Sequence, residues 1–177
     1  MRALLYSAAG YISGSILFAR VFGAVFKKDI LNQSRDGNPG TANAFMYGGF
    51  FCGVLTLLFE LLKGFIPVFL YLRKTPLLFN SLGLAFVLAA PVLGHAFPIF
   101  YRFSGGKGIA VSFGCLLGLL PAVTPVSVLA FTFLFFSLVL KIEPHYHRTF
   151  LTYALSAVLL FLIMPNKYIC WGFAVIT

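Results

Sequence analysis

Two glycine-rich polar segments interrupt an otherwise apolar chain, and each carries residue types that suit phosphate binding. The first, residues 32–43, reads Asn-Gln-Ser-Arg-Asp-Gly-Asn-Pro-Gly-Thr-Ala-Asn. Its glycines, Gly40 among them, and its proline rule out a regular helix, and successive amide N–H groups in such a turn can converge on an anion. Asn38, Thr41 and Asn43 add side-chain donors. We therefore favour an anion site here over the alternative, a solvated turn.

The second segment, residues 94–108, ends in the turn Ser-Gly-Gly-Lys-Gly at the predicted start of a helix. Backbone donors, the helix dipole and Lys107 all favour a bound phosphate at such a position. Gly105, Gly106 and Gly108 are the glycines of this turn. It is not a Walker A loop, because no Ser or Thr follows the lysine.

His95 lies twelve residues before Lys107 and is predicted to face the same side of the membrane. A histidine placed there can accept a proton or donate a hydrogen bond to phosphate. The alternative is a histidine that only packs and hydrogen-bonds within the protein. Arg102 and Lys107 share its segment, which favours the functional interpretation.

A pair of opposite charges, Glu60 and Lys63, stands within a long apolar stretch. The two residues are one helical turn apart and therefore lie on the same face. Each would be costly alone in hydrocarbon, so they either pair with each other or face a polar cavity. A structural ion pair and a functional pair both remain open at this point.

The composition indicates what kind of protein must position these residues. Of 177 residues 60% are hydrophobic and only 10% are charged, with 13 Lys+Arg against 4 Asp+Glu. Such a chain has too few polar residues to cover a water-facing surface, which excludes a soluble globular domain and a disordered tail. It also excludes a nucleic-acid-binding module. We expect one integral membrane domain over residues 1–177.

Charge-free runs predict an all-α, polytopic transmembrane helix bundle. They cover residues 3–19, 37–59, 75–101, 108–140, 149–166 and 168–177. The fourth run is too long for one helix, and Pro121 and Pro125 divide it into two. We expect six complete spans and a partial seventh, with the first retained rather than cleaved as a signal peptide. In that first span Gly10 and Gly14 have the spacing of close helix packing.

Alternating the spans places the loops 27–45, 102–107 and 141–148 on one side of the membrane. That side carries eight basic residues: Arg20, Lys27, Lys28, Arg35, Arg102, Lys107, Lys141 and Arg148. The other side carries four, so the first is predicted to be cytoplasmic and the N-terminus external. Both glycine segments then meet at the cytoplasmic face. His145 and His147 lie in the third of these loops and are interpreted as interfacial polar residues, not as metal ligands.

The ordered segments resemble the bacterial acyl-phosphate:glycerol-3-phosphate acyltransferases, the PlsY family. Residues 10–16 are similar to the family's opening helix, and residues 36–43 to its first motif, usually Ser-Gly-Asn-x-Gly-Ala-Thr-Asn. Residues 60–64 resemble its Asp-x-x-Lys-Gly, and residues 94–108 its glycine-rich motif. The resemblance covers roughly residues 10–120.

The resemblance implies a seven-helix enzyme of the bacterial inner membrane, with its site facing the cytoplasm. It implies transfer of a fatty acyl group from acyl phosphate to glycerol 3-phosphate, which forms lysophosphatidate for phospholipid synthesis. Neither a cofactor nor a metal is implied. His95 and Lys107 are the expected catalytic residues. The expected substrate-binding residues are Arg35, Asn38, Gly40, Thr41, Asn43, Lys63, Arg102, Gly105, Gly106 and Gly108.

The chain departs from the family pattern at several positions. Asp36 stands where the family has serine, and a carboxylate there is expected to repel an anionic substrate. Met46 replaces an expected arginine, for which Arg35 is the predicted substitute. The family also continues beyond the position of Thr177 to a basic His-Arg-x-Asn tail that is expected to take part in catalysis.

Two other functions remain open from the sequence. One is a catalytically impaired relative that binds a phospholipid precursor or a protein partner. The other is a small transporter of an anionic metabolite that uses the same loops, although no inverted repeats are evident.

Overall fold

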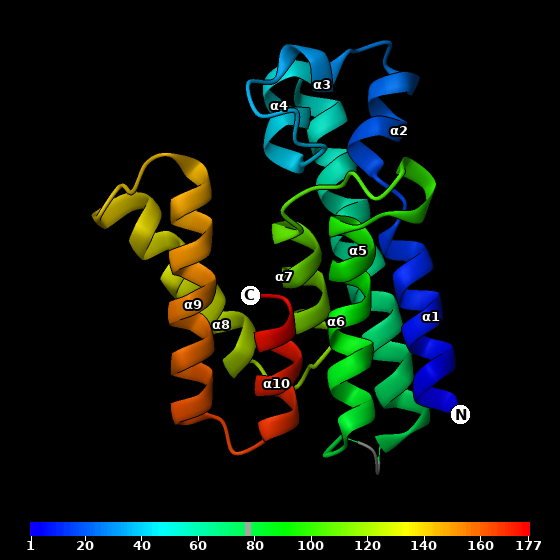
Figure 1. The fold of residues 1–177 in the computed structure, drawn as a ribbon, viewed down its shortest axis with the longest axis vertical. Coiled ribbons are helices and arrows are strands. Elements are labelled where there is room, and N and C mark those ends of the chain that lie inside the picture. Colours follow the sequence, from blue (N-terminus) through cyan, green and yellow to red (C-terminus); the bar gives the residue numbers. More distant parts are fainter. Residues whose placement is uncertain (77–78) are drawn as a thin grey trace.

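A computed structural model describes residues 1–76 and 79–177, and within these residues every regular element is helical (Figure 1). The elements are α1 (Arg2–Gly14), α2 (Phe18–Val25), α3 (Ile30–Gln33), α4 (Thr41–Gly48), α5 (Phe50–Lys74), α6 (Leu82–Ala96), the 3-10 turn η2 (Ile99–Tyr101), α7 (Ile109–Leu117), α8 (Thr124–Leu134), the π-helical turn η3 (Phe135–Val139), α9 (His145–Ile163) and α10 (Lys167–Val175). The predicted run 75–101 includes residues 77–78, which lie outside the described residues.

Among the described residues, four stretches are long and apolar enough to cross a membrane: Arg2–Val25, Phe50–Lys74, Leu82–Tyr101 and His145–Ile163. The predicted all-helical membrane architecture is therefore confirmed. Helices α7 and α8 are shorter than the roughly 20 residues that a straight span needs. Residues 118–123 connect α7 to α8. They include Pro121 and are followed by Pro125 in the first turn of α8, as the two prolines predicted.

Close helix contact at the first span depends on small residues. Gly10 of α1 packs on the ring of Pro91 in α6, and a methyl group at Gly14 would overlap the Pro91 carbonyl. Gly94 of α6 lies in the same way against the carbonyl of Tyr11. These approaches bring two backbones together without intervening side chains, as predicted for this glycine pair.

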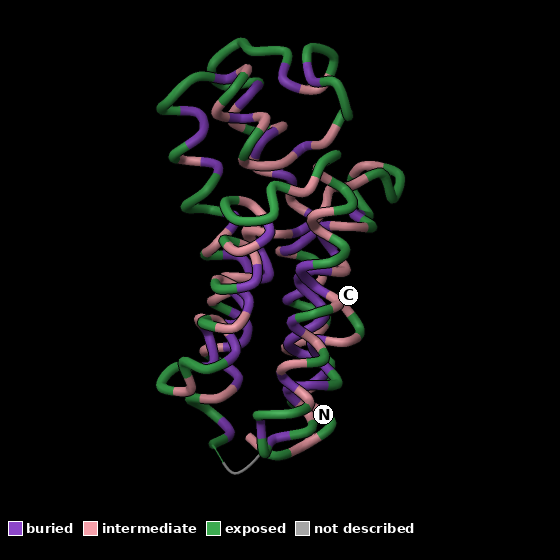
Figure 2. Tube along the Cα trace, turned by 90° about the vertical axis from the view of Figure 1, so that its left-hand side faces the viewer, coloured by how far each residue is buried: buried purple, intermediate pink, exposed green. Residues whose placement is uncertain are grey.

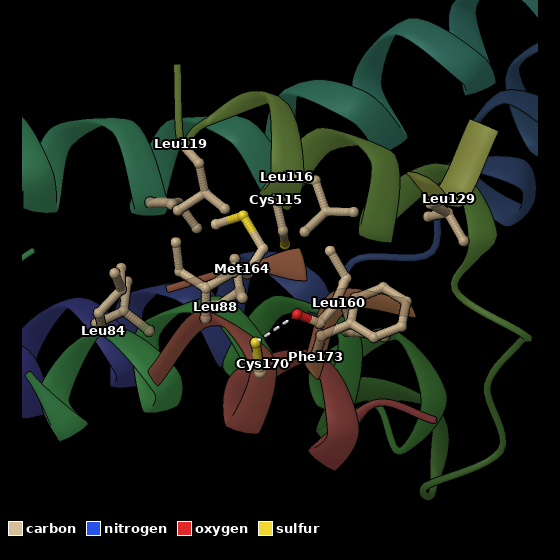
Figure 3. Packing of buried hydrophobic residues seen from close by; sticks show 14 of the residues in the cluster. Leu84, Leu88, Cys115, Leu116, Leu119, Leu129, Leu160, Met164, Cys170 and Phe173 are labelled. Atoms are coloured by element: carbon tan, nitrogen blue, oxygen red, sulfur yellow. Dashed lines mark hydrogen bonds between the residues drawn. The ribbon is translucent and has the colours of Figure 1, made fainter. Parts of the chain in front are cut away.

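An apolar core fills the space between α5, α6, α7, α9 and α10 (Figure 3). Leu84 and Leu88 of α6 pack there with Leu116 of α7 and Phe173 of α10. The Cys170 thiol in this cluster donates a hydrogen bond to the Leu160 carbonyl. Figure 2 shows buried residues along the inner faces of the helices and many exposed ones on their outer faces. Those outer positions carry numerous large apolar side chains, which suit contact with lipid.

The polar loops gather at one end of the molecule, drawn uppermost in Figure 1. Helices α2, α3 and α4 lie there with the segment that joins α6 to α7 and the loop that precedes α9. The N-terminus, the C-terminal end of α5, the start of α6 and the α9–α10 turn lie at the opposite end, where Arg2 donates to the Lys74 carbonyl. The loops 27–45, 102–107 and 141–148, which were predicted to share one side of the membrane, thus lie at the same end of the molecule.

Candidate active site

A buried polar centre joins α5 to α6. The Lys63 Nζ atom lies 2.8 Å from Oε2 of Glu60, and Nδ1 of His95 lies 3.0 Å from the same oxygen. Lys63 Nζ and His95 Nδ1 are also 3.0 Å apart. All three side chains are at least 97% buried. The charges of span α5 therefore pair with each other and also contact the histidine.

This centre is built on an interruption of the first span. Helix α1 ends at Gly14 and α2 begins at Phe18, which leaves backbone groups at the break without partners in either helix. Lys63 Nζ donates to the carbonyls of Gly14 and Ile16, at 3.0 and 2.6 Å.

On the other side of the break, the Phe18 N–H donates to Glu60 Oε1 at 3.1 Å. The ammonium group therefore faces the negative end of α1, and the carboxylate of Glu60 faces the positive start of α2. One ion pair of α5 caps both helices of the broken span, which explains how two charges are stable at this depth.

A second ion pair connects the two glycine-rich segments. Lys107 Nζ lies 2.9 Å from Oδ2 of Asp36. The other carboxylate oxygen accepts hydrogen bonds from the side chain of Asn43 and the backbone N–H of Asn38. Asn43 also donates to the Asn38 carbonyl, and the Lys107 N–H donates to Asn38 Oδ1. Asp36 thus orders both segments.

The Asp36 carboxylate is therefore paired with Lys107 and held by hydrogen bonds, and its repulsion of an anionic substrate stays a prediction. Partial burial by itself would raise the pKa of Asp36. The hydrogen bonds from Lys107, Asn43 and Asn38 outweigh that effect and lower the pKa to about 2. Its negative charge is therefore permanent at neutral pH and is compensated by the adjacent ammonium group.

A cavity of about 340 Å³ opens beside both ion pairs. One wall is polar and contains Asn38, Gly40, Thr41, His95, Lys107 and Gly108, with Glu60 behind them. The other wall is apolar and contains Phe45, Leu57, Phe113 and Phe133. The cavity can hold a molecule that is anionic at one end and aliphatic at the other.

Two helices begin at the polar wall. Helix α4 starts at Thr41 after Gly40, and α7 starts at Ile109 after Gly108, and neither has a side-chain cap at its first turn. The Thr41 hydroxyl is buried and has no hydrogen-bond partner among the described residues. Free amide groups, two helix dipoles and this hydroxyl make the wall suitable for a phosphate group.

Comparison with known proteins agrees with this geometry. The family model described as "Glycerol-3-phosphate acyltransferase" matches residues 4–177. This chain belongs to that family. A glycerol-3-phosphate acyltransferase of Cupriavidus taiwanensis is 40% identical over 122 residues, which are 68% of this chain and 60% of the relative. One of Actinobacillus pleuropneumoniae is 36% identical over 164 residues, or 92% of this chain and 72% of the relative.

Solved structures show the same fold. The glycerol 3-phosphate form of PlsY, an integral membrane glycerol 3-phosphate acyltransferase, superposes with a TM-score of 0.82 at 29% identity. That match covers 99% of this chain and 84% of the other. The lysophosphatidic acid form gives a TM-score of 0.78 at 28% identity. The chain spans about 60% of the length of the Cupriavidus relatives it matches.

Gly105 and Gly106 of the second segment pack against His95. A methyl group at Gly105 would overlap the His95 carbonyl, and one at Gly106 would approach His95 Nε2 and Asn38 Oδ1. The Gly106 N–H donates to the His95 carbonyl at 3.1 Å. Both glycines allow close packing around the imidazole, and their predicted contact with substrate stays a prediction.

The remaining residues that were predicted to bind substrate are not among those that line the cavity. Arg35 and Arg102 are exposed and are not among the lining residues. Lys63 contacts Glu60 and His95 but does not line the cavity, and Asn43 donates a hydrogen bond to Asp36. Their roles in substrate binding stay predictions.

Two ionisable side chains that line the cavity, those of Glu60 and His145, were not predicted as site residues. Glu60 was predicted either to pair with Lys63 or to face a polar cavity, and its contact with His95 joins residues 35 positions apart in sequence. His145 lines the cavity from the start of α9, with Nδ1 3.1 Å from the Thr149 hydroxyl. Its sequence context, a polar loop between apolar runs, gives no signal of that position.

Proposed function

We propose that this protein is a membrane acyltransferase that transfers a fatty acyl group from acyl phosphate to glycerol 3-phosphate. The observation that carries the proposal is the divided cavity, with two helix N-termini and Lys107 on one wall and aromatic side chains on the other. Its relatives are named glycerol-3-phosphate acyltransferases, and one solved PlsY structure is a glycerol 3-phosphate form. Lysophosphatidate is the proposed product.

The reaction needs a proton acceptor, and we assign this role to His95. Its Nδ1 lies against Glu60, and its Nε2 lies on the side of Gly106 and Asn38. With the Nδ1 proton donated to Glu60, Nε2 is free to accept the proton of the glycerol 3-phosphate hydroxyl. Glu60 and Lys63 are proposed as positioning residues, because each has a side-chain atom 3.0 Å from Nδ1 of the imidazole.

The hydroxyl oxygen, once deprotonated, attacks the acyl carbon and forms the new ester bond. The bond between that carbon and the phosphate oxygen breaks, and inorganic phosphate leaves. Lys107 and the free amides of α4 are placed to stabilise the negative charge on the phosphate groups. Catalysis then depends on positioning and charge stabilisation.

The proposed topology rests on the basic loops at the end of the molecule that carries the cavity. We propose a multi-pass protein of the bacterial inner membrane, folded as one membrane domain with six complete spans and a partial seventh at α10. The basic loops support a cytoplasmic position for the site and an external N-terminus. Arg35 and Arg102, exposed at this end, are proposed to attract the two anionic substrates to the cavity.

Purified protein in detergent, given acyl phosphate and labelled glycerol 3-phosphate, tests the activity. Labelled lysophosphatidate is expected from the unmodified protein and from Lys74→Ala, a lysine at the opposite end, but not from Lys107→Ala. Product no greater than that of Lys107→Ala would contradict the proposal. Binding of glycerol 3-phosphate without product would then indicate an impaired relative. Uptake into proteoliposomes without product would indicate a transporter.

A further inference from the structure

A second polar cleft lies on the first membrane span, away from the active-site cavity. It has a volume of about 550 Å³ and is formed by α2, residues 27–29 and the start of α3. No residue lines both this cleft and the active-site cavity. Three of its lining residues are cationic: Arg20, Lys27 and Lys28.

The cationic residues of this cleft outnumber its acidic ones. Asp29 is the one acid among the lining residues, and its carboxylate accepts from the backbone and side chain of Asn32. Within residues 1–76 and 79–177, neither lysine nor Arg20 forms an ion pair. The Arg20 Nε atom is buried and, across the same residues, has no hydrogen-bond partner.

An aromatic ring orients Arg20, and an ordered backbone turn carries the two lysines. Arg20 lies with its guanidinium carbon 5.0 Å from the centre of the Tyr101 ring, a cation–π contact that fixes its orientation. Lys27 has a left-handed conformation with φ of 54°, which ends α2 and which glycine adopts with less strain. The N–H groups of Lys27 and Lys28 donate to the carbonyls of Ala24 and Gly23. The backbone of both lysines is thus held by an ordered turn at the cleft.

The cleft lies at the end of a membrane span. Helix α2 is the last part of the candidate span Arg2–Val25. Apolar side chains of α2 and the following turn, Val21, Val25 and Phe26, are exposed beside the cationic residues. Exposed apolar side chains next to an excess of cationic residues form the surface expected at the boundary between acyl chains and phosphate headgroups.

We propose that this cleft binds the headgroup of an anionic phospholipid from the surrounding bilayer. The Arg20 guanidinium is the phosphate ligand, because its planar donors match two phosphate oxygens. Lys27 and Lys28 supply the further positive charge that an anionic headgroup needs, and the acyl chains lie along Val21 and Val25. The site is independent of the acyltransferase reaction.

Lipid titration followed by native mass spectrometry tests the proposal. The protein in nonionic detergent is titrated with phosphatidylglycerol, phosphatidylcholine and inorganic phosphate, and bound molecules are counted. We expect one phosphatidylglycerol to be retained preferentially. The double variant Lys27→Gln/Lys28→Gln should weaken that binding on the order of 30-fold, from the usual contribution of a lysine at an anionic surface. Arg20→Gln should weaken it further.

The matched control is Arg73→Gln/Lys74→Gln, a neighbouring basic pair at the opposite end of the molecule, which should leave binding unchanged. Equal loss in both double variants would overturn the proposal in favour of diffuse attraction. Equal binding of phosphatidylcholine would also overturn it. Displacement of the lipid by inorganic phosphate at similar concentration would indicate a free-anion site instead. If Arg20→Gln fails to fold, the lysine pair, which is exposed, decides the result.

Discussion

Two ion pairs of nearly equal length have different surroundings in this protein. Glu60 and Lys63 are separated by 2.8 Å and have side chains 1% and 3% exposed, whereas Asp36 and Lys107 are separated by 2.9 Å and are 46% and 26% exposed. The first pair is enclosed by α1, α2 and α6, while the second faces water and the cavity. Distance alone therefore does not indicate what an ion pair contributes.

Glu60 and Lys63, the inner pair, have no water beside them that could solvate one charge if the other were removed. Asp36 and Lys107 are the outer pair. Each charge of the inner pair is bound to a helix end and to His95, so we expect the group to remain fixed during a reaction. The outer pair exchanges with water at little cost. Lys107 can therefore leave Asp36 for a substrate phosphate, which makes the outer pair the adjustable part of the site and the inner pair its frame.

Glu60→Leu should give the largest effect. It leaves the Lys63 ammonium buried without its carboxylate, which costs about 3–5 kcal/mol of unfolding free energy in comparable cases. Denaturant unfolding in detergent measures this loss. The double variant Glu60→Leu/Lys63→Met should recover part of it, because no unpaired charge remains, but not all, because Gly14 and Ile16 lose their donor. A single variant as stable as the unmodified protein would show that the inner pair is not a frame.

His95→Gln should affect catalysis more than folding. Glutamine keeps a polar group near Glu60 but cannot accept the hydroxyl proton, and loss of a general base typically lowers the rate by about 10²–10⁴-fold. The turnover number should fall with little change in the unfolding free energy. A decrease of less than about tenfold would be too small for a general base.

Lys107→Ala should separate activity from stability most clearly. Removing one charge-stabilising donor commonly lowers turnover by about 10²–10³-fold. The unfolding free energy should change by less than about 1 kcal/mol, since the pair is partly exposed. Lys107→Arg retains the charge and should recover part of the turnover. Equal loss of stability in Lys107→Ala and Glu60→Leu would remove the distinction between the two pairs.

Features with local causes could be predicted from the sequence. The low content of charged residues and the charge-free runs predicted the helical membrane fold. The pair of prolines predicted the turn before α8. The close packing of Gly10 and Gly14 follows in the same way from spacing. The glycine segments also predicted the polar wall of the cavity.

Features with distant causes could not be predicted. Residues 15–17, Ser-Ile-Leu, contain neither glycine nor proline, so nothing local indicates that the first span breaks there. The break is stabilised by Lys63 and Glu60, more than 40 positions away in sequence. The pairing of Asp36 with Lys107 spans 71 positions, and without it a lone carboxylate in an anion site implies repulsion.

Asp36→Asn should have the smallest effect on stability and tests whether the outer pair is adjustable. The pKa of Asp36 in the fold is about 2, below the ordinary 3.8, so folding favours its ionised form. Its contribution is complete above about pH 4 and is lost as the pH falls toward 2. Asparagine should remove this acid dependence and cost less than about 1 kcal/mol at neutral pH, because the carboxylate is nearly half exposed.

The same variant also frees Lys107 from its partner while Asn43 and Asn38 still have an oxygen to donate to. If Lys107 exchanges Asp36 for phosphate, the KM for glycerol 3-phosphate should fall in Asp36→Asn, because substrate no longer competes with a carboxylate. Initial rates across substrate concentrations, together with unfolding between pH 2 and 6, measure both effects. An increased KM would mean that Asp36 holds Lys107 in its working position, and the outer pair would then be a second frame rather than an adjustable contact.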